Sequence, residues 1–275
     1  MISATSAELL SNKDLGRDNF LLELQAPEIA CSCTPGQFVM AWVEEGLNLP
    51  FPLLRKALAV YSLPNSERGK ITLLIKVVGD GTAKLAGAEP GNTIGLIGPL
   101  GNGFETNLSP GKRALIVAGG TGIASVFLLS ENLIKNNHPV HLVYGARQAE
   151  DLVGLEDFEL LGIPSTITTD DGSRGIQGQV TQGLEHYLQQ NIAEKSVIYT
   201  CGPTPMMRAV SRVAENWGIP CQISVEVKMA CGFGVCLGCT VKTRSAYRLA
   251  CTHGPVFDAA DFIWEKTASI SELAT

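Results

Sequence analysis

Four cysteines near the carboxyl end of this 275-residue chain constrain it more than any other feature. Cys231, Cys236 and Cys239 follow the spacing C-x4-C-x2-C, and Cys251 comes twelve residues after Cys239. Three clustered thiols with one distant thiol are the ligand pattern of plant-type [2Fe–2S] sites. The glycines between these cysteines let the backbone curl tightly, because glycine adopts positive φ at little cost. The spacing therefore predicts a [2Fe–2S] cluster with these four cysteines as its metal ligands.

Other interpretations of the four thiols have less support from the sequence. A four-cysteine zinc site is the main alternative, but such sites usually combine two short C-x2-C pairs. Disulfides are disfavoured because nothing in the sequence suggests secretion. Four unrelated buried thiols would rarely cluster in this way. Cys31 and Cys33 form a separate C-x-C pair with no further ligands nearby in the sequence, and ordinary thiols beside a turn explain them best.

Composition excludes several classes of protein. The net charge of −6 leaves no electrostatic footprint for nucleic acid. The first residues lack the basic start and apolar run of a signal peptide, and no stretch approaches 18 consecutive apolar residues. The length predicts two domains with a small appendage, in a cytoplasmic protein.

Residues 1–108 read as an antiparallel β-barrel. Short apolar runs alternate here with corners rich in Gly, Pro, Asn and Ser, which predicts five or six strands. The runs are Phe20–Leu24, Gln37–Val43, Lys56–Tyr61, Ile71–Val78 and Thr93–Ile97.

Three features of the barrel are suited to an anionic or flat ligand. Arg55 opens a strand at a place where its guanidinium fits a phosphate. Gly79–Thr82 precedes a short helix, and its amides and hydroxyl form a plausible anion site. Gly98–Phe104 is a glycine-rich turn that ends in an aromatic ring. Each feature by itself is also explained by a solvated arginine or a plain turn.

Residues 109–225 alternate between strands and helices, which predicts a doubly wound α/β domain whose ligands bind beyond the carboxyl ends of the strands. The predicted strands are Arg113–Ala118, Val140–Tyr144, Ser165–Thr169, Val197–Cys201 and Gln222–Glu226. The predicted helices are Ile123–Lys135, Glu150–Leu161, Thr181–Ala193 and Pro205–Trp217.

Three strand ends in this domain carry suitable residues for a dinucleotide. Gly119, Gly120, Thr121 and Gly122 lie between a strand and a helix, where amides favour a pyrophosphate. The segment Thr169–Ser173, which includes Asp171, offers hydroxyls and carboxylates to a ribose. Cys201 ends the next strand, where its thiol is either a contact to a nicotinamide ring or a small residue that fills a tight strand end.

In many segments the chain resembles the ferredoxin reductase-like flavoproteins. Within these, the chain looks most like the electron-transfer subunits of NAD-linked dihydroorotate dehydrogenases. The segments are Pro35–Val39, Val78–Thr82, Gly98–Phe104, Ala118–Ile123, Gly145–Arg147, Thr169–Ser173, Cys201–Pro203, Met229–Gly232 and Cys251–Phe257. They span nearly the whole chain, and the cysteine loop with Gly254–Phe257 is the most specific of them.

The resemblance implies FAD in a groove of the barrel. The positions that match the flavin contacts of the family are Arg55, Lys56, Ala57, Leu58, Leu74, Ile75 and Lys76, with Gly81 and Thr82 at the pyrophosphate. The sequence departs from the family pattern at one place in this region. The family usually shows Arg-Arg-Pro-x-Ser, whereas this chain has Ala57 and Ala59 in place of the proline and the serine.

The resemblance also implies an electron path and a partner. Electrons would pass from an FMN-containing dihydroorotate dehydrogenase catalytic subunit through the [2Fe–2S] cluster, held in residues 226–275, and through FAD to NAD(H). NAD is favoured over NADP because residues 145–151 carry one base against two acids, although Arg174 would reverse this if it pointed into the site.

The sequence is also compatible with rival functions. They are the flavin subunit of a ferredoxin–NAD(P) oxidoreductase or of a sulfur-reducing hydrogenase, and a zinc-stabilised nucleotide-binding module without redox turnover.

Overall fold

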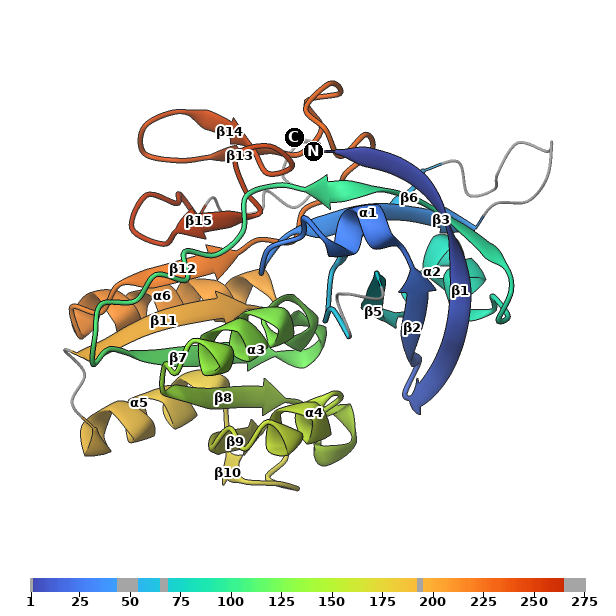
Figure 1. The fold of residues 1–275 in the computed structure, drawn as a ribbon. Helices are drawn as coiled ribbons and strands as arrows, with labels where there is room; N and C mark the ends of the chain where they lie inside the picture. The colour runs from blue at the N-terminus through green and yellow to red at the C-terminus, as the bar shows by residue number, and fades with distance from the viewer. Residues whose placement is uncertain (1, 44–53, 65–68, 192–194, 265–275) are drawn as a thin grey trace, which may run out of the picture.

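The amino-terminal part of the chain folds as a nearly closed antiparallel barrel (Figure 1). The computed structural model describes residues 2–43, 54–64, 69–191 and 195–264. Six strands form one sheet in the order β4-β3-β6-β1-β2-β5, and a bridge between Ser62 and Thr72 links its two edges. The strands are β1 (Ser3–Gly16), β2 (Asn19–Gln25), β3 (Phe38–Val43), β4 (Lys56–Ala59), β5 (Lys70–Lys76) and β6 (Thr93–Leu100). Two short helices, α1 (Pro27–Ala30) and α2 (Asp80–Ala86), lie among them.

The strand β1 is the barrel element that the apolar runs did not predict. It pairs with both β2 and β6, so it lies in the middle of the sheet. Only Ala7 and Leu9 among its residues are buried, because most of its length faces solvent on one side. Its mostly polar sequence therefore gave no apolar signal, and its backbone pairing holds it in place.

The second sheet is a doubly wound α/β layer, as the alternation predicts. Its strand order is β10-β9-β8-β7-β11-β12-β15, and every pairing is parallel except that of β12 with β15. The strands are β7 (Arg113–Gly119), β8 (Val140–Ala146), β9 (Ser165–Thr169), β10 (Ile176–Gln177), β11 (Ser196–Cys201), β12 (Cys221–Ser224) and β15 (Val256–Asp258). The helices are α3 (Phe127–Lys135), α4 (Leu155–Leu160), α5 (Val180–Gln190) and α6 (Thr204–Asn216).

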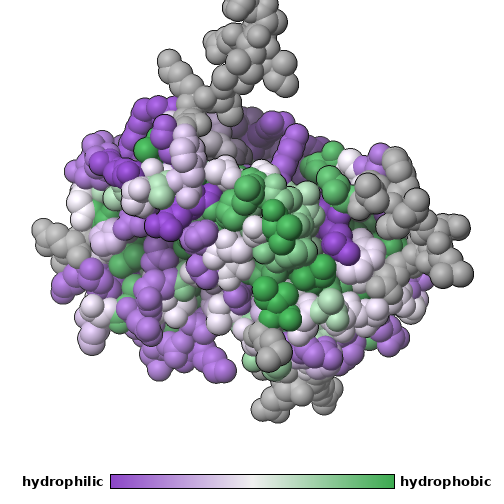
Figure 2. All heavy atoms as spheres, turned by 90° about the horizontal axis from the view of Figure 1, so that it is seen from above, coloured by the Kyte–Doolittle hydropathy of each residue, from purple (hydrophilic) through white to green (hydrophobic). Residues whose placement is uncertain are grey.

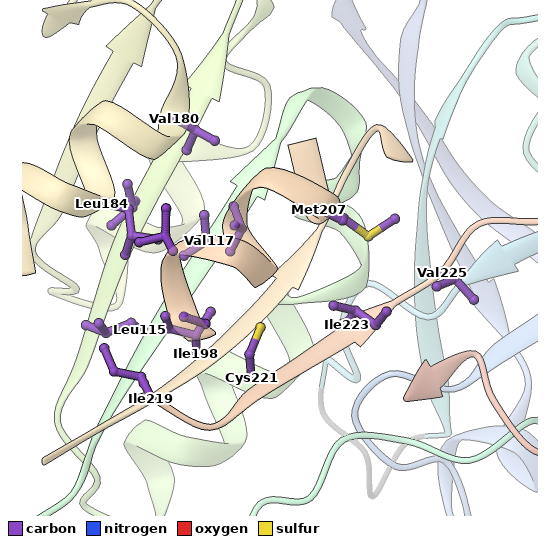
Figure 3. Packing of buried hydrophobic residues seen from close by; sticks show 14 of the residues in the cluster. Leu115, Val117, Val180, Leu184, Ile198, Met207, Ile219, Cys221, Ile223 and Val225 are labelled. Carbon is purple, nitrogen blue, oxygen red and sulfur yellow. The ribbon is translucent and has the colours of Figure 1, made fainter. Parts of the chain in front are cut away.

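Buried apolar side chains cover both faces of this sheet. On one face, Leu115 and Val117 of β7 pack with Ile198 of β11 against residues of α5 and α6, including Leu184 and Met207 (Figure 3). The alternate residues of β7, such as Ile116, pack on the other face with α3 and α4. Burial on both faces explains why these strands read as continuous apolar runs.

Two predicted helices differ in detail from the structure. The predicted helix at 123–135 is divided into a 3₁₀ turn, η2 (Gly120–Ser125), and the α-helix α3. The predicted helix at 150–161 consists of the 3₁₀ turn η3 (Ala149–Asp151) and α4. Gly154, with φ of +72°, separates them, because a left-handed residue cannot continue a helix.

The described part of the C-terminal region holds a hairpin of β13 (Thr240–Lys242) and β14 (Tyr247–Leu249), and then β15. The strand β15 extends the α/β sheet, so this region is continuous with the second domain. The predicted limits at 108 and 225 remain predictions. Among the described helices, none is long and apolar enough to span a membrane.

Candidate functional site

A cleft of about 1020 Å³ lies between the barrel and the α/β domain. The barrel contributes the turn after β1 and the end of β5 through Arg17, Asp18, Asn19 and Lys76. The α/β domain contributes residues at the carboxyl ends of β7, β8, β9 and β11, the edge where such sheets bind ligands. The size and position of the cleft suit a dinucleotide.

The predicted glycine segment after β7 lines this cleft, with Gly119, Gly120, Thr121 and Gly122 all at its wall. The close packing explains two of the glycines. A Cβ at Gly119 would collide with the Met206 side chain, and one at Gly122 would collide with the backbone at Cys201. The segment therefore brings its backbone amides near the space where the prediction places a pyrophosphate.

Cys201 lies at the end of β11 with its side chain fully buried, next to the cleft residue Gly202. Its thiol donates a hydrogen bond to Glu226 Oε1 at 3.9 Å. Burial and the nearby Glu226 carboxylate raise the pKa of this thiol, so it stays protonated near neutral pH. The structure thus shows a buried thiol behind the cleft wall, and a role at the nicotinamide remains a prediction.

Glu226 is one of the cleft residues that the sequence did not single out, as is Arg17 of the barrel. Glu226 lies two residues after the end of β12 and lines the cleft, where its side chain is exposed. Desolvation by the neighbouring cleft wall raises the pKa of Glu226, while the Cys201 hydrogen bond opposes the rise. The sequence signal was its position at the end of the last parallel strand, where ligand contacts gather.

The predicted ribose contact Asp171 is exposed and does not line the cleft. Its neighbour Asp170 does line the cleft. The Asp171 carboxylate accepts hydrogen bonds from the hydroxyl and the amide of Ser173, at 2.6 and 3.0 Å. These bonds lower the pKa of Asp171 and hold it ionised. Arg174, the residue that would favour NADP, pairs with Glu159 at 3.1 Å.

The predicted phosphate contacts of the barrel are engaged with protein groups. The Arg55 guanidinium lies 4.4 Å from the centre of the Trp42 ring. The Lys56 side chain covers Gly81 so closely that a Cβ there would collide with it. The Thr82 hydroxyl accepts from the Val78 amide and donates to the Gly79 carbonyl, both at 2.9 Å. Thr82 therefore fixes the turn before α2 in this structure.

The remaining predicted flavin contacts differ in exposure. Leu74 and Ile75 are buried in the barrel, whereas Lys76 reaches the cleft. Ala57 is exposed and Leu58 is partly exposed on β4, a strand at the end of the sheet. The structure thus brings Lys76 and the glycine segment together in one cleft. The residues of β4 do not line this cleft and lie elsewhere on the barrel.

The four predicted cluster ligands lie in two pairs. Cys239 Sγ is 3.2 Å from Cys251 Sγ, and both residues are buried. The Cys236 amide donates to Cys231 Sγ at 3.4 Å, in the more exposed pair. Among the residues that the structure describes, no three His, Cys, Asp or Glu side chains form a group that could hold one metal ion. Two sulfur pairs are the arrangement that a cluster of two irons requires, with two ligands on each iron.

The backbone of the cysteine loop is shaped for this arrangement. Gly232, Gly234 and Leu237 all have positive φ, at 85°, 89° and 60°. A Cβ at Gly232 would collide with Met40 of β3, so the glycine permits the loop to pack on the barrel.

The thiols of the two pairs differ in acidity. Burial opposes ionisation of Cys231, but hydrogen bonds from the amides of Cys236 and Phe233 outweigh it and lower its pKa to about 6. Burial, and then the neighbouring Cys239, raise the pKa of Cys251 to about 12. Iron binding takes place through thiolates, so Cys251 must release its proton when the cluster is inserted. The donor set and the pairing fit a [2Fe–2S] cluster.

Comparison with known families accounts for most of the chain. Residues 6–104 match the oxidoreductase FAD-binding domain, and residues 116–212 match the oxidoreductase NAD-binding domain. Residues 226–263 match the iron–sulfur cluster binding domain of dihydroorotate dehydrogenase B. The chain therefore carries domains for all three predicted cofactors, in the predicted order.

Relatives of known name match over nearly the full length. The electron transfer subunit of dihydroorotate dehydrogenase B (NAD(+)) from Desulforamulus reducens is 32% identical over 269 residues, which cover 96% of this chain and all of that protein. The subunit of the same name from Bacillus caldolyticus is 34% identical, with the same coverage. That from Caldanaerobacter subterraneus is 37% identical over 84% of this chain and 87% of its own.

A solved structure of an NADH-dependent reduced ferredoxin–NADP oxidoreductase superposes with a TM-score of 0.83 at 28% identity, covering 94% of this chain and 90% of that chain. The cytochrome b5 reductase domain of Ulva prolifera nitrate reductase shares the fold, with a TM-score of 0.65 at 19% identity over 79% of this chain and 94% of that chain. The predicted ferredoxin reductase-like fold is confirmed. Together with the named relatives, these likenesses show that the chain belongs to the family of electron transfer subunits of dihydroorotate dehydrogenase B.

Proposed function

We propose that this chain is the electron-transfer subunit of an NAD-linked dihydroorotate dehydrogenase and serves pyrimidine biosynthesis. The observation that carries the proposal is the two pairs of cysteines packed on the same barrel that borders the cleft between the domains. The three domains and the full-length relatives support the same assignment. When bound, a nicotinamide exchanges a hydride, and a flavin divides such an electron pair into the single electrons that an iron–sulfur centre carries.

In this scheme, the residues of the chain bind the cofactors and hold them in position. We infer that the glycine segment Gly119–Gly122 holds the dinucleotide pyrophosphate, while Lys76 faces it from the barrel. Cys201 lies buried behind the space for the nicotinamide, and Glu226 lines the cleft beside it. Arg55 and β4 offer a cation and an open strand to the flavin.

The cluster loop carries the features of a docking face. Phe233, Val235 and Leu237 are 41%, 72% and 62% exposed, although they lie within five residues of one another. Figure 2 shows hydrophobic side chains gathered near the middle of the face where the C-terminal hairpin lies, with hydrophilic ones on either side. Exposed apolar side chains grouped in this way are typical of protein interfaces.

The charge beside this loop indicates what kind of partner fits it. The hairpin at 240–249 carries Lys242, Arg244 and Arg248 and no acidic residue, in a chain of net charge −6. We infer that the partner is an FMN-containing dihydroorotate dehydrogenase catalytic subunit, with an apolar face rimmed by carboxylates around its electron exit. The four cysteines outside the proposed cluster are unpaired thiols, which suit a reducing compartment, so we place the assembly in the cytoplasm.

A second candidate function rests on two observations. The likeness to the NADH-dependent reduced ferredoxin–NADP oxidoreductase covers almost the whole chain, and this chain lacks the proline and serine expected at Ala57 and Ala59. A flavin subunit that serves a different electron donor would share the same three domains.

One experiment separates these functions. The chain is purified without oxygen, together with the proteins that bind it, and its flavin, iron, sulfide and zinc are measured. We expect FAD, two irons per chain, and NADH formation that depends on dihydroorotate once the FMN subunit is present. Turnover with ferredoxin and no response to dihydroorotate would support the second function. A colourless protein with one zinc would overturn both.

A further inference from the structure

The turn between β1 and β2 reaches from the barrel to the α/β domain at the mouth of the cleft. Arg17 at its tip forms an ion pair with Asp151, with Nη2 and Nε both 3.2 Å from Oδ1. The Arg17 guanidinium also contacts the side-chain amide oxygen of Gln148. All three residues line the cleft, so the contact spans its opening.

The turn is held rigidly in the shape that presents Arg17. Arg17 and Asp18 have φ of 54° and 61°, a conformation that side chains other than glycine rarely adopt. The buried Asn19 side chain stabilises it by donating to the carbonyls of Gly16 and Arg17, at 3.0 and 2.9 Å. The Val77 amide donates to the Asp18 carbonyl at 2.8 Å and ties the turn to the end of β5.

A second contact between the two domains is of a different kind. Tyr61 is buried, stacks on Phe127 with ring centres 4.5 Å apart, and donates to Asp157 Oδ2 at 2.5 Å. Removal of this contact would break the stacking of a buried ring and leave the partly buried Asp157 carboxylate without this hydrogen bond, which is costly. Arg17 and Asp151 are 51% and 20% exposed, and an exposed ion pair contributes little free energy. The contact at the cleft mouth is therefore the one that opens easily.

We propose that the Arg17 turn is a strap that positions the cleft for its dinucleotide, with Tyr61 as the fixed contact on which the domains stay joined. Arg17 neutralises Asp151, which would otherwise repel a pyrophosphate, and it holds Gln148 and η3 against the cleft. Arg17 is thus a positioning residue, and it needs no direct contact with the reacting atoms. This inference rests on the proposed function because it requires a dinucleotide in the cleft.

The test compares Arg17→Ala, Asp151→Asn and the double variant, in the chain loaded with its cofactors. We expect the Kd for NADH to rise about three- to fivefold in Arg17→Ala, the effect of an exposed ion pair. The double variant should bind no more weakly than the weaker single variant, because the two residues act as one unit. Glu159→Gln is the matched control, since it breaks the exposed Arg174–Glu159 pair inside the α/β domain. An unchanged Kd in Arg17→Ala, or an equal effect of Glu159→Gln, would overturn the strap.

A second measurement does not depend on NADH. Amide hydrogen exchange of residues 148–152, without nucleotide, should become faster in Arg17→Ala and stay unchanged in Glu159→Gln. If the wild-type chain failed to bind NADH, the proposed function would fail, while this exchange comparison would still decide whether the strap exists. Equal exchange in all variants would exclude it.

Discussion

Gly232 lies directly against Met40, so the turn that follows the first cluster cysteine rests on strand β3 of the barrel. In the register of β3 with β4, Met40 stands opposite Ala57, one of the residues predicted to lie along the flavin. A single strand therefore separates the cysteine loop from the proposed flavin surface. Electron transfer requires the two cofactors to lie close together. This packing would place a cluster in the cysteine loop close to a flavin bound at the β4 surface.

Loss of one cluster ligand should separate the two halves of the electron path. In Cys236→Ser, we expect the iron content and electron transfer to the partner to be lost, because the exposed sulfur pair is broken. Flavin reduction by NADH should remain close to that of the wild type. Iron analysis and stopped-flow absorbance measure the two effects. Cys31→Ser is the matched control at another exposed thiol, and equal loss of both activities would contradict the order of cofactors.

Arg55 is predicted to hold the flavin. The Arg55→Ala variant should lower the FAD content of the purified protein severalfold, because the guanidinium on Trp42 is a cation beside the open strand β4. FAD released by denaturation is measured against protein concentration. Arg212→Ala removes an exposed arginine from α6 as a control, and an unchanged FAD content in Arg55→Ala would place the phosphate contact elsewhere.

Cys201 is predicted to influence hydride exchange. In Cys201→Ala, NADH-driven flavin reduction should slow by roughly tenfold or more, since a gap behind the nicotinamide would spoil its position. FAD content should not change. Cys221→Ala removes another buried thiol, from the neighbouring strand β12, and tests whether any cavity has the same effect. Equal rates in Cys201→Ala and wild type would show that Cys201 only fills the strand end.

A negative charge introduced into the docking face should weaken binding of the partner subunit. Val235→Glu places a carboxylate in the apolar loop opposite the proposed acidic rim, and we expect it to weaken binding of the FMN subunit at least tenfold. Its cluster and its NADH-driven flavin reduction should be retained. Leu160→Glu, on a similarly exposed leucine of α4, is the control. Binding is measured by light scattering or calorimetry, and unimpaired assembly of Val235→Glu would move the interface elsewhere.

Glu131 should make stability depend on pH. Burial, and then the nearby Asp157 carboxylate, raise the pKa of Glu131 to about 7. Because the folded pKa lies above the unfolded value, the contribution of Glu131 to stability is fully present below about pH 4.5 and is lost as the pH rises through 7. Glu131→Gln should therefore be more stable than the wild type at pH 8, by about 1 kcal/mol or 2–4 °C in Tm after allowance for partial exposure, and not at pH 4.5.

Thermal unfolding of both proteins at the two pH values checks this. Glu185→Gln, on the exposed face of α5, provides the matched control and should show no such difference. A stabilisation of Glu131→Gln that is the same at both pH values would contradict the assigned ionisation.

Local patterns in the sequence determined the cofactor set and the order of the domains. The C-x4-C-x2-C spacing, the apolar runs of β7 and β11, and the glycines after β7 each lie within a few residues, so neighbouring side chains alone define them. The tertiary structure decided what depends on distant segments. It placed β1 inside the barrel, joined β15 to the α/β sheet, set Glu226 at the cleft and brought Arg17 to Asp151, 134 residues away. Such contacts follow from how whole domains pack, and no local periodicity encodes them.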